Sequence, residues 1–275
     1  MSIQDIEEIL VSAGIEPNEA KIEIKMLIEH FGEYSVKDLI MGKKLDEKKL
    51  ELVKEKAEYR ARTREPIQYI IGYAEFMKHK YKVTKDVLIP RDETELITVR
   101  AIEAVREKSY KKVLDVGTGS GCIACEIAFY TEAQVLGVDI SSDALRIALE
   151  NSESLKLQNK AIFRKSDIFS GVNDGETFDL IVSNPPYIPK NEVLQKEVMY
   201  EPKLALYTSD EQGLEFYKKI ISDAKKYLNK NGQIMFELGI KQSELVKDIL
   251  VVNGFQDINI EKDLAGIERL ISAKI

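Results

Sequence analysis

Short apolar runs alternate with amphipathic segments over residues 91–275. Helical spacing of apolar residues in the intervening segments predicts helices, and the apolar runs predict buried strands. Five such strands are predicted at the segments KKVLDV, QVLGVD, AIFRKSD, FDLIVSN and GQIMFEL. Strand–helix alternation is typical of a mostly parallel sheet that is covered by helices on both faces.

Two further strands are predicted at the end of the chain, at FQDINIE and ERLISAKI. A short link containing DLAG joins them, which favours an antiparallel pair. The sequence therefore predicts an α/β fold with a mostly parallel sheet of seven strands and an antiparallel last strand. Sheets of this kind bind ligands at the carboxyl ends of their strands, near the point where the strand order reverses.

The first third of the chain has a different pattern. Residues 1–65 repeat apolar side chains at helical spacing, for example at Ile6, Ile9 and Leu10, and predict a small helical bundle. Residues 66–90 begin with a proline and carry aromatic side chains in two short runs near Phe76 and Tyr81, which predicts a β-hairpin connector. We therefore expect three parts, at residues 1–65, 66–90 and 91–275.

Composition narrows the class of protein. The formal net charge is −7, whereas proteins that bind nucleic acid through bulk charge are usually basic, so no nucleic-acid partner is expected. The sequence carries neither the basic, apolar start of a signal peptide nor an apolar run long enough to cross a membrane. We expect a cytoplasmic protein without a membrane partner.

The two cysteines and two histidines predict no redox or metal centre. Cys122 and Cys125 have the spacing of a redox pair, but they fall in the helix after a glycine-rich turn, where small residues pack against a sheet. We interpret them as packing residues. His30 and His79 lie far from the other motifs and are interpreted as surface or hinge residues, and no metal cluster is expected.

A glycine-rich turn follows the first strand of the sheet. Its glycines permit positive φ and let a ligand approach the backbone, and the next helix offers free N–H groups to an anion. Asp115 heads the turn, where it suits an ammonium group better than a diphosphate, which indicates a cofactor that carries an amino acid. The candidate cofactor-binding residues of this turn are Asp115, Gly117, Thr118, Gly119, Ser120 and Gly121.

Acidic residues also end the next two strands. Asp139 lies 18 residues after Gly121, where a carboxylate accepts the two hydroxyls of a ribose. Asp167 ends the third strand and could accept a hydrogen bond from an adenine amino group. Ile168 and Phe169 would pack against the ring. Together these positions indicate a nucleoside-containing cofactor.

The segment Asn184-Pro185-Pro186-Tyr187 ends the fourth strand and indicates the chemistry. A planar NH2 group is a poor nucleophile because its lone pair is delocalised. The side-chain oxygen of Asn184 and the main-chain oxygen of Pro185 can accept its two N–H groups. The prolines stiffen the segment, and the Tyr187 ring can stack on the planar group beside a sulfonium. We predict Asn184, Pro185 and Tyr187 as catalytic.

The glycine turn, the strand-end acids and the NPPY segment together resemble the class I methyltransferase superfamily. Further motifs resemble the release-factor glutamine methyltransferases (the PrmC or HemK family). The segments of this chain that resemble family segments are EPIQYIIG (65–72), PRDETE (90–95), EPKLAL (201–206) and the pattern of Gly266, Glu268 and Arg269. The resemblance covers roughly residues 60–275 by motif, and the helical N-terminal region fits in arrangement.

This resemblance implies a Rossmann-like class I methyltransferase domain that uses S-adenosyl-L-methionine as cofactor. It implies methylation of the side-chain nitrogen of the glutamine in the Gly-Gly-Gln tip of class 1 peptide chain release factors. The glutamine amide would be held by residues 184–187, including Pro186, and Asn184 would also contact the cofactor. The N-terminal bundle and the hairpin would help to dock the substrate. The chain departs from the family pattern at Asp92, which replaces a proline, and at Ile168, where some members carry an aromatic residue.

Two other functions are compatible with parts of the pattern. NPPY alone also permits a nucleic-acid methyltransferase acting on the amino group of adenine or guanine, which must extract the base from its stack. A non-catalytic cofactor-binding module is the third hypothesis, and the intact NPPY segment argues against it.

Overall fold

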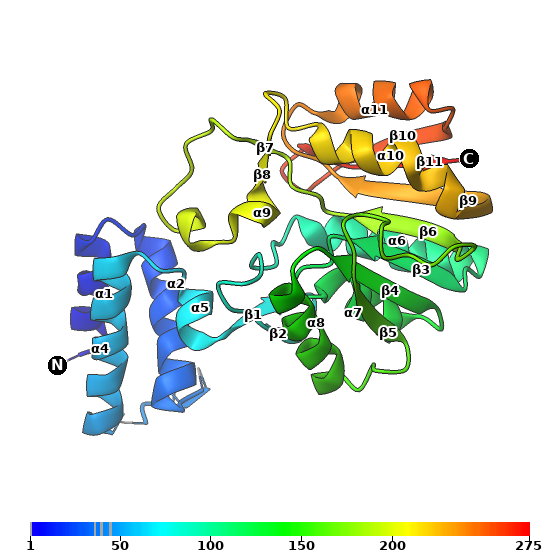
Figure 1. The fold of residues 1–275 in the computed structure, drawn as a ribbon. Coiled ribbons are helices and arrows are strands. Elements are labelled where there is room, and N and C mark those ends of the chain that lie inside the picture. The colour runs from blue at the N-terminus through cyan, green and yellow to red at the C-terminus, as the bar shows by residue number, and fades with distance from the viewer. Residues whose placement is uncertain (1, 36, 39–40, 44–45) are drawn as a thin grey trace. The chain divides into compact units, whose positions relative to one another are not determined.

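The computed structural model describes residues 2–35, 37–38, 41–43 and 46–275 (Figure 1). The chain forms two compact units. The first unit contains residues 1–73 together with residues 194–200, and the second contains residues 74–193 and 201–275. The first unit thus extends beyond residue 65, and it includes a segment that lies far downstream in the sequence.

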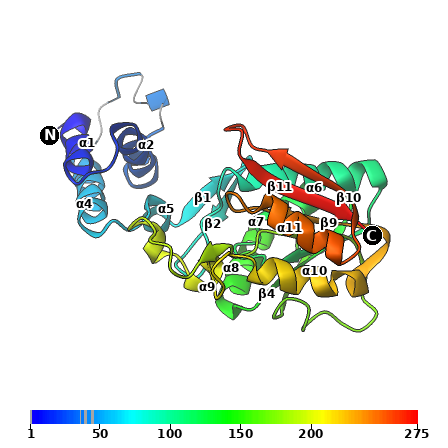
Figure 2. The ribbon, with the colours of Figure 1, turned by 90° about the horizontal axis from the view of Figure 1, so that it is seen from above.

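The first unit is helical, as its apolar periodicity predicts. Its elements are α1 (Ile3–Ser12), α2 (Pro17–Leu27), the π-helical turn η1 (Ile28–Gly32), α4 (Glu47–Thr63) and α5 (Ile67–Ile71). Ser2 caps α1, because its hydroxyl accepts the backbone N–H of Asp5 at 3.2 Å and so satisfies a free helix-end donor. Figure 2 shows α1, α2 and α4 side by side, and their inward side chains, among them Ile6 and Leu10, are fully buried.

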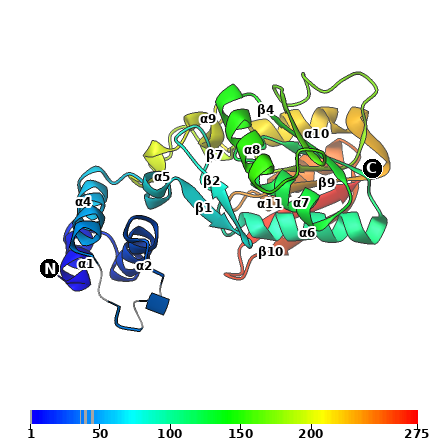
Figure 3. The same cartoon turned by 90° about the horizontal axis from the view of Figure 1, so that it is seen from below.

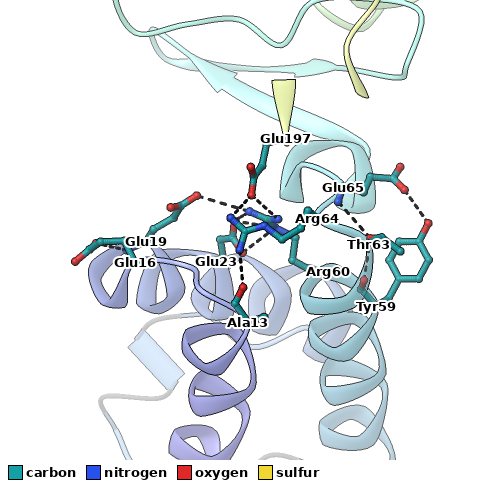
Figure 4. A network of polar contacts seen from close by, with 10 residues as sticks. All are labelled: Ala13, Glu16, Glu19, Glu23, Tyr59, Arg60, Thr63, Arg64, Glu65 and Glu197. Atoms are coloured by element: carbon teal, nitrogen blue, oxygen red, sulfur yellow. Dashed lines mark hydrogen bonds and ion pairs between the residues drawn. The ribbon is translucent and has the colours of Figure 1, made fainter. Parts of the chain in front are cut away.

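A buried arginine binds residues 194–200 into this unit (Figure 4). Arg60 on α4 is only 1% exposed, and its Nη2 lies 2.7 Å from Oε1 of buried Glu23. Its Nη1 lies 3.1 Å from Oε1 of Glu197, which also binds Arg64 at 2.5 Å. These charge-assisted contacts hold a segment that follows the NPPY residues by only a few positions.

The second unit is built on a seven-stranded sheet, as predicted. In spatial order the strands are β10 (Gln256–Lys262), β11 (Glu268–Lys274), β9 (Leu228–Glu237), β6 (Phe178–Ser183), β3 (Lys112–Val116), β4 (Gln134–Asp139) and β5 (Ala161–Lys165). The pairs from β9 to β5 are parallel. The last strand, β11, is antiparallel to both of its neighbours, which confirms the predicted antiparallel end.

Helices cover both faces of this sheet. Because neighbouring strand residues point to opposite faces, Val113 and Leu180 pack with α6 (Thr94–Lys108) and α7 (Cys122–Tyr130). Leu114 and Ile181 pack instead with α10 (Glu215–Tyr227) and α11 (Ser243–Val252). Figure 2 shows α10 and α11, and Figure 3 shows α6 and α7 with α8 (Ser142–Ser154) from the opposite side.

The predicted hairpin is present as β1 (Tyr73–Phe76) and β2 (His79–Lys82). Phe76 and Tyr81 are buried in the core with the α6 and α7 side chains. The Tyr81 hydroxyl donates to the buried carboxylate of Glu126 at 2.7 Å. His79 lies 2.8 Å from the same oxygen, so the interpretation of His79 as a surface or hinge residue is wrong: a buried acid holds it.

Short elements follow the fourth parallel strand. They are β7 (Ile188–Pro189), the 3₁₀ turn η2 (Val198–Tyr200), α9 (Lys203–Leu206) and β8 (Tyr207–Thr208). Strands β7 and β8 pair with each other in parallel. None of the helices in the described part of the chain combines the length and the apolar character that a membrane span requires.

Candidate active site

A cavity of about 180 Å³ lies at the carboxyl ends of β3, β4 and β6. From β3 the chain adds β4 and β5 on one side and β6 and β9 on the other, so this cavity lies at the point where the strand order reverses. That is the position where parallel α/β sheets bind ligands. The predicted site residues that line it are Gly117, Gly119, Asp139, Asp167, Ile168, Asn184, Pro185 and Pro186.

Five predicted site residues are absent from the lining of this cavity. They are Asp115, Thr118, Ser120, Gly121 and Tyr187. Each of them is close in sequence to residues that do line the cavity, because it belongs to the glycine turn or to the NPPY segment. Their roles toward a cofactor or substrate stay predictions.

The glycine turn opens its backbone toward the cavity. Gly117 and Gly119 have φ of +74° and +54°, and a Cβ atom added at either position would meet no atom of the described part of the chain within 4 Å. The Gly119 N–H donates to Oδ2 of Asp139 at 2.9 Å, which ties the turn to the end of β4. Glycine is favoured here because of the left-handed conformation, and the open space leaves room for a ligand against the backbone.

Asp115 lies beneath the turn and is fully buried. Its Oδ2 accepts the Thr118 hydroxyl at 2.6 Å, whereas Oδ1 has no hydrogen-bond partner among the residues that the structure describes. Burial raises the pKa of this carboxyl to about 7, because a low-dielectric surrounding disfavours the charged form. A buried acceptor without a partner is costly, and a donor supplied by a ligand would relieve that cost.

Asp139 is already engaged with the backbone. Its Oδ1 accepts the Ser141 N–H at 2.9 Å and its Oδ2 accepts Gly119. Burial raises its pKa, while these backbone N–H groups lower it. Each carboxylate oxygen has two lone pairs, so both oxygens retain the capacity to accept a hydroxyl, as the prediction for a ribose requires.

The turn after β5 completes this side of the cavity. Asp167 is exposed, and its backbone N–H donates to Ser170 Oγ at 2.9 Å. Ile168 has a φ of +53°, which is strained for a β-branched residue. The Ser166 hydroxyl donates to the Ile168 carbonyl oxygen at 2.7 Å and holds this conformation, which presents Ile168 to the cavity.

Asn184 lines the cavity at the end of β6, and a hydrogen bond to a neighbouring residue holds its side-chain amide. Its Nδ2 donates to Thr94 Oγ1 at 3.2 Å. Tyr187 is not among the residues that line the cavity: its ring packs against the core cluster that contains the α10 side chains, and its hydroxyl donates to Glu237 Oε1 at 3.4 Å. Burial raises the Tyr187 pKa. The predicted stacking of Tyr187 on a substrate amide therefore stays a prediction.

From the sequence we assigned no role at the site to four residues that the structure places around the NPPY segment. Thr94 and Glu237 contact Asn184 and Tyr187, and Arg91 pairs with buried Glu201. One signal for Glu237 was available. Glu237 is the last residue of the fifth parallel strand along the chain, and acidic residues had already been noted at the ends of earlier strands, at Asp115, Asp139 and Asp167.

The cysteine interpretation is confirmed. Cys122 and Cys125 are buried, unbonded thiols on α7, and they pack in the core between that helix and the sheet. Burial raises the pKa of Cys122 to about 12, which suppresses the reactive thiolate. Among the described residues no group of three or more His, Cys, Asp or Glu side chains is placed to hold a metal ion.

The chain is similar in sequence to known methyltransferases. Residues 107–261 match the model of a family described as a methyltransferase domain. The release factor glutamine methyltransferase of Lactococcus lactis subsp. lactis is 42% identical over 241 residues, covering 86% of each chain. The protein of the same name from Clostridium acetobutylicum is 41% identical over 213 residues, which is 76% of this chain and 74% of that one.

The fold is also shared with solved structures. A ribosomal protein L11 methylase from Lactobacillus delbrueckii subsp. bulgaricus aligns with a TM-score of 0.51 at 24% identity. The alignment covers 67% of this chain and 80% of the methylase. At this identity the likeness concerns the fold alone.

The fold and the family match define a class I methyltransferase. Within that class, the identity and mutual coverage shared with the curated relatives place the chain more narrowly. It belongs to the family of release factor glutamine methyltransferases.

Proposed function

We propose that this chain transfers a methyl group from S-adenosyl-L-methionine to the side-chain amide nitrogen of the glutamine in the Gly-Gly-Gln motif of class 1 release factors. One observation carries the proposal. Asn184 and Pro185 line the same cavity as Gly117, Gly119 and Asp139, so acceptors for an amide and the features expected of a cofactor site share one space.

The residues present fit S-adenosyl-L-methionine. Asp139 would accept the ribose hydroxyls, and Asp167 with Ile168 would contact the adenine. The exposed backbone of Gly117 and Gly119 would receive the amino-acid part, near the unpartnered Oδ1 of Asp115. When bound, this cofactor supplies an electrophilic methyl carbon on a positively charged sulfur.

The residues of the NPPY segment would hold the glutamine amide. The Asn184 Oδ1 and the Pro185 carbonyl oxygen would accept its two N–H groups, and this would leave the nitrogen lone pair free to face the methyl group that the bound cofactor supplies. The products are N-methylated glutamine, S-adenosyl-L-homocysteine and one proton. Orientation of two reactants can supply about 7–11 kcal/mol in favourable cases, so positioned acceptors suffice without a strong general base.

The proposed protein partner is a class 1 release factor. Support comes from the names of the relatives, several of which are release factor glutamine methyltransferases at 38–43% identity. The net charge of −7 argues against the alternative substrate, a nucleic-acid base. A cytoplasmic location remains the expectation from the sequence.

The decisive assay presents both substrate classes together. The protein is incubated with methyl-labelled cofactor, an unmodified release factor and total RNA, followed by mass spectrometry of the Gly-Gly-Gln peptide. The proposal predicts one added methyl group on the glutamine. A matched release factor with this glutamine changed to alanine should stay unlabelled. Label in adenine or guanine, with none in the peptide, would reject the proposal in favour of the nucleic-acid alternative.

A further inference from the structure

A buried side-chain amide contacts the main chain at the end of the NPPY segment. Gln242 directly precedes α11 and is 7% exposed. Its Nε2 donates to the carbonyl oxygens of Tyr187 at 3.0 Å and Gln212 at 2.9 Å, and lies 3.4 Å from that of Gly213. Its Oε1 accepts the Gly239 N–H at 3.0 Å. Gln242 thus joins the NPPY segment to the turn before α10 and to the segment before α11.

The direction of the Gln242 amide follows from its partners. The Gly239 N–H can only donate, whereas the Tyr187 and Gln212 carbonyl oxygens can only accept. An amide turned the other way would place its oxygen against the two carbonyl oxygens and its NH2 group against an N–H group. Among the described residues the side chain makes no capping hydrogen bond to α11. Both ends of the amide are therefore used in contacts outside the helix that it precedes.

Two glycines provide the space that this amide occupies. A Cβ atom at Gly239 would lie 2.4 Å from Gln242 Oε1, and a Cβ atom at Gly213 would lie 2.4 Å from its Nε2. Gly239 is not among the residues with positive φ, so close packing accounts for glycine there better than backbone conformation does. Because closely packed interiors resist displacement, the amide is held in place from both sides.

A short and stiff stretch of main chain connects this contact to the cavity. Tyr187 is two residues from Pro185, which lines the cavity. The ring of Pro186 fixes its φ at about −65°, and Pro185 is confined to extended conformations because it precedes a proline. A shift of the Tyr187 carbonyl group is therefore passed on to the Pro185 carbonyl group. Gln242 is not among the residues that line the cavity, so it acts through this main chain.

We propose that Gln242 is a positioning residue that keeps the Pro185 carbonyl oxygen where the substrate amide needs an acceptor. It does so by binding the Tyr187 carbonyl oxygen through its Nε2 group. The inference rests on the proposed function, in which the Pro185 oxygen and Asn184 Oδ1 accept the two N–H groups of the substrate glutamine. Because Asn184 remains as the second acceptor, removal of Gln242 should lower turnover without abolishing it.

Two substitutions of Gln242 separate its donors from its acceptor. Gln242→Met removes both at similar length, and we expect it to lower kcat about 10- to 100-fold, as misplacement of reacting groups does. Gln242→Glu keeps an oxygen for the Gly239 N–H but offers at most one hydrogen to the carbonyl groups in either protonation state. It should lower kcat at least about tenfold. The Kd of S-adenosyl-L-methionine should stay within about threefold in both variants.

A smaller change tests the same contact while the amide is still present. Gly239→Ala places a methyl group against Gln242 Oε1 and must displace the amide, so kcat should fall on the order of tenfold. Gly232→Ala is the matched control. Gly232 also lacks a positive φ, and its Cβ atom would lie 2.8 Å from the Asn229 carbonyl oxygen. This variant crowds the main chain away from the NPPY segment and should keep wild-type kcat.

A second control uses the same substitution at another buried glutamine. Gln233 on β9 is 8% exposed, and its Oε1 accepts a hydrogen from Lys108 Nζ at 2.7 Å. Gln233→Met should keep kcat within about threefold. In every variant the stoichiometry of S-adenosyl-L-methionine binding measures the folded fraction, and kcat on an unmodified release factor is divided by it. A general loss of folded protein therefore lowers the stoichiometry, whereas a loss of positioning lowers the corrected kcat.

The outcomes separate the inference from the proposed function. If both Gln242 variants keep the corrected wild-type kcat while Asn184→Ala lowers it at least about 100-fold, the positioning role is wrong and the proposed function stands. If Gln233→Met loses as much corrected kcat as Gln242→Met, the loss of any buried amide is responsible, and the inference also fails. If Asn184→Ala turns over normally, the proposed site itself is wrong.

Discussion

Arg91 and Glu201 form an ion pair that joins the segment before α6 to the segment after η2. Glu201 is 4% exposed and also accepts the Ile89 N–H at 3.2 Å. The Arg91 side chain is 32% exposed. Leu88 precedes this contact, and Pro202 follows it, in the lining of the cavity, so the pair fixes two parts of the cavity wall.

Removing Arg91 should lower the free energy of unfolding more than removing the charge of Glu201. Arg91→Ala leaves a buried carboxylate without its counter-charge and should lower the free energy of unfolding by about 3 kcal/mol. Glu201→Gln leaves Arg91 able to reach water and should cost less, on the order of 1 kcal/mol. Chemical denaturation of the two variants checks the order, and equal losses would contradict this account of the pair.

Gly213 supports the NPPY segment through close packing. It has a φ of +71°, and a Cβ atom there would lie 2.0 Å from the Tyr187 carbonyl oxygen. Gly213→Ala should therefore displace Tyr187 and lower kcat on the order of 100-fold. Gly175 is the matched control, because it has a φ of +77° but open space around it. Gly175→Ala carries the same backbone strain of about 1–2 kcal/mol and should keep full activity.

Asp115 should make stability depend on pH. Its pKa is raised to about 7 in the folded protein, against about 3.9 when unfolded. Between these values the folded chain binds more protons than the unfolded chain, so the free energy of unfolding falls as pH rises from about 4 to 7. Below this window the group is neutral in both states and the penalty is absent.

Asp115→Asn should remove this contribution. Without cofactor, the variant should gain stability relative to wild type as pH rises, by up to ~4 kcal/mol above pH 7. Glu237 shifts in the same direction and is present in both proteins, so the difference between them isolates Asp115. Thermal unfolding across this pH range makes the comparison. A stability difference that is constant with pH would show that Asp115 is not buried as an acid.

Arg60 should be critical for the first unit. Arg60→Ala leaves Glu23, which is 3% exposed, without its counter-charge, and should lower the free energy of unfolding by about 3–5 kcal/mol. Arg62, exposed two positions later on α4, is the control, and Arg62→Ala should change stability by less than about 0.5 kcal/mol. Similar losses in both variants would refute a special role for the buried ion pair.

Much of the fold could be predicted from local patterns. The apolar runs alternate between the two faces of the sheet, as Leu180 and Ile181 illustrate, so period and spacing were enough to predict the strands. Helix ends also depend on nearby residues: Ser141 caps α8 by accepting the Ala144 N–H at 3.1 Å. Such features depend on contacts within a few residues along the chain.

The rest depends on contacts between distant residues. Glu197 binds Arg60, 137 positions away, and no local pattern assigns residues 194–200 to the helical unit. The conformation of the glycine turn brings the Thr118 hydroxyl onto Asp115, while the predicted contact of Asp115 with a ligand stays a prediction. The direction of the Asn184 amide likewise depends on Thr94, 90 positions upstream, which only the folded chain brings into contact.

The central claim concerns Asn184 as the acceptor that orients the glutamine amide. Its most direct test is the single-turnover rate of Asn184→Ala on an unmodified release factor, measured together with cofactor Kd. The account predicts a rate at least about 100-fold lower with a Kd within about tenfold of wild type. A wild-type rate in this variant would contradict the claim.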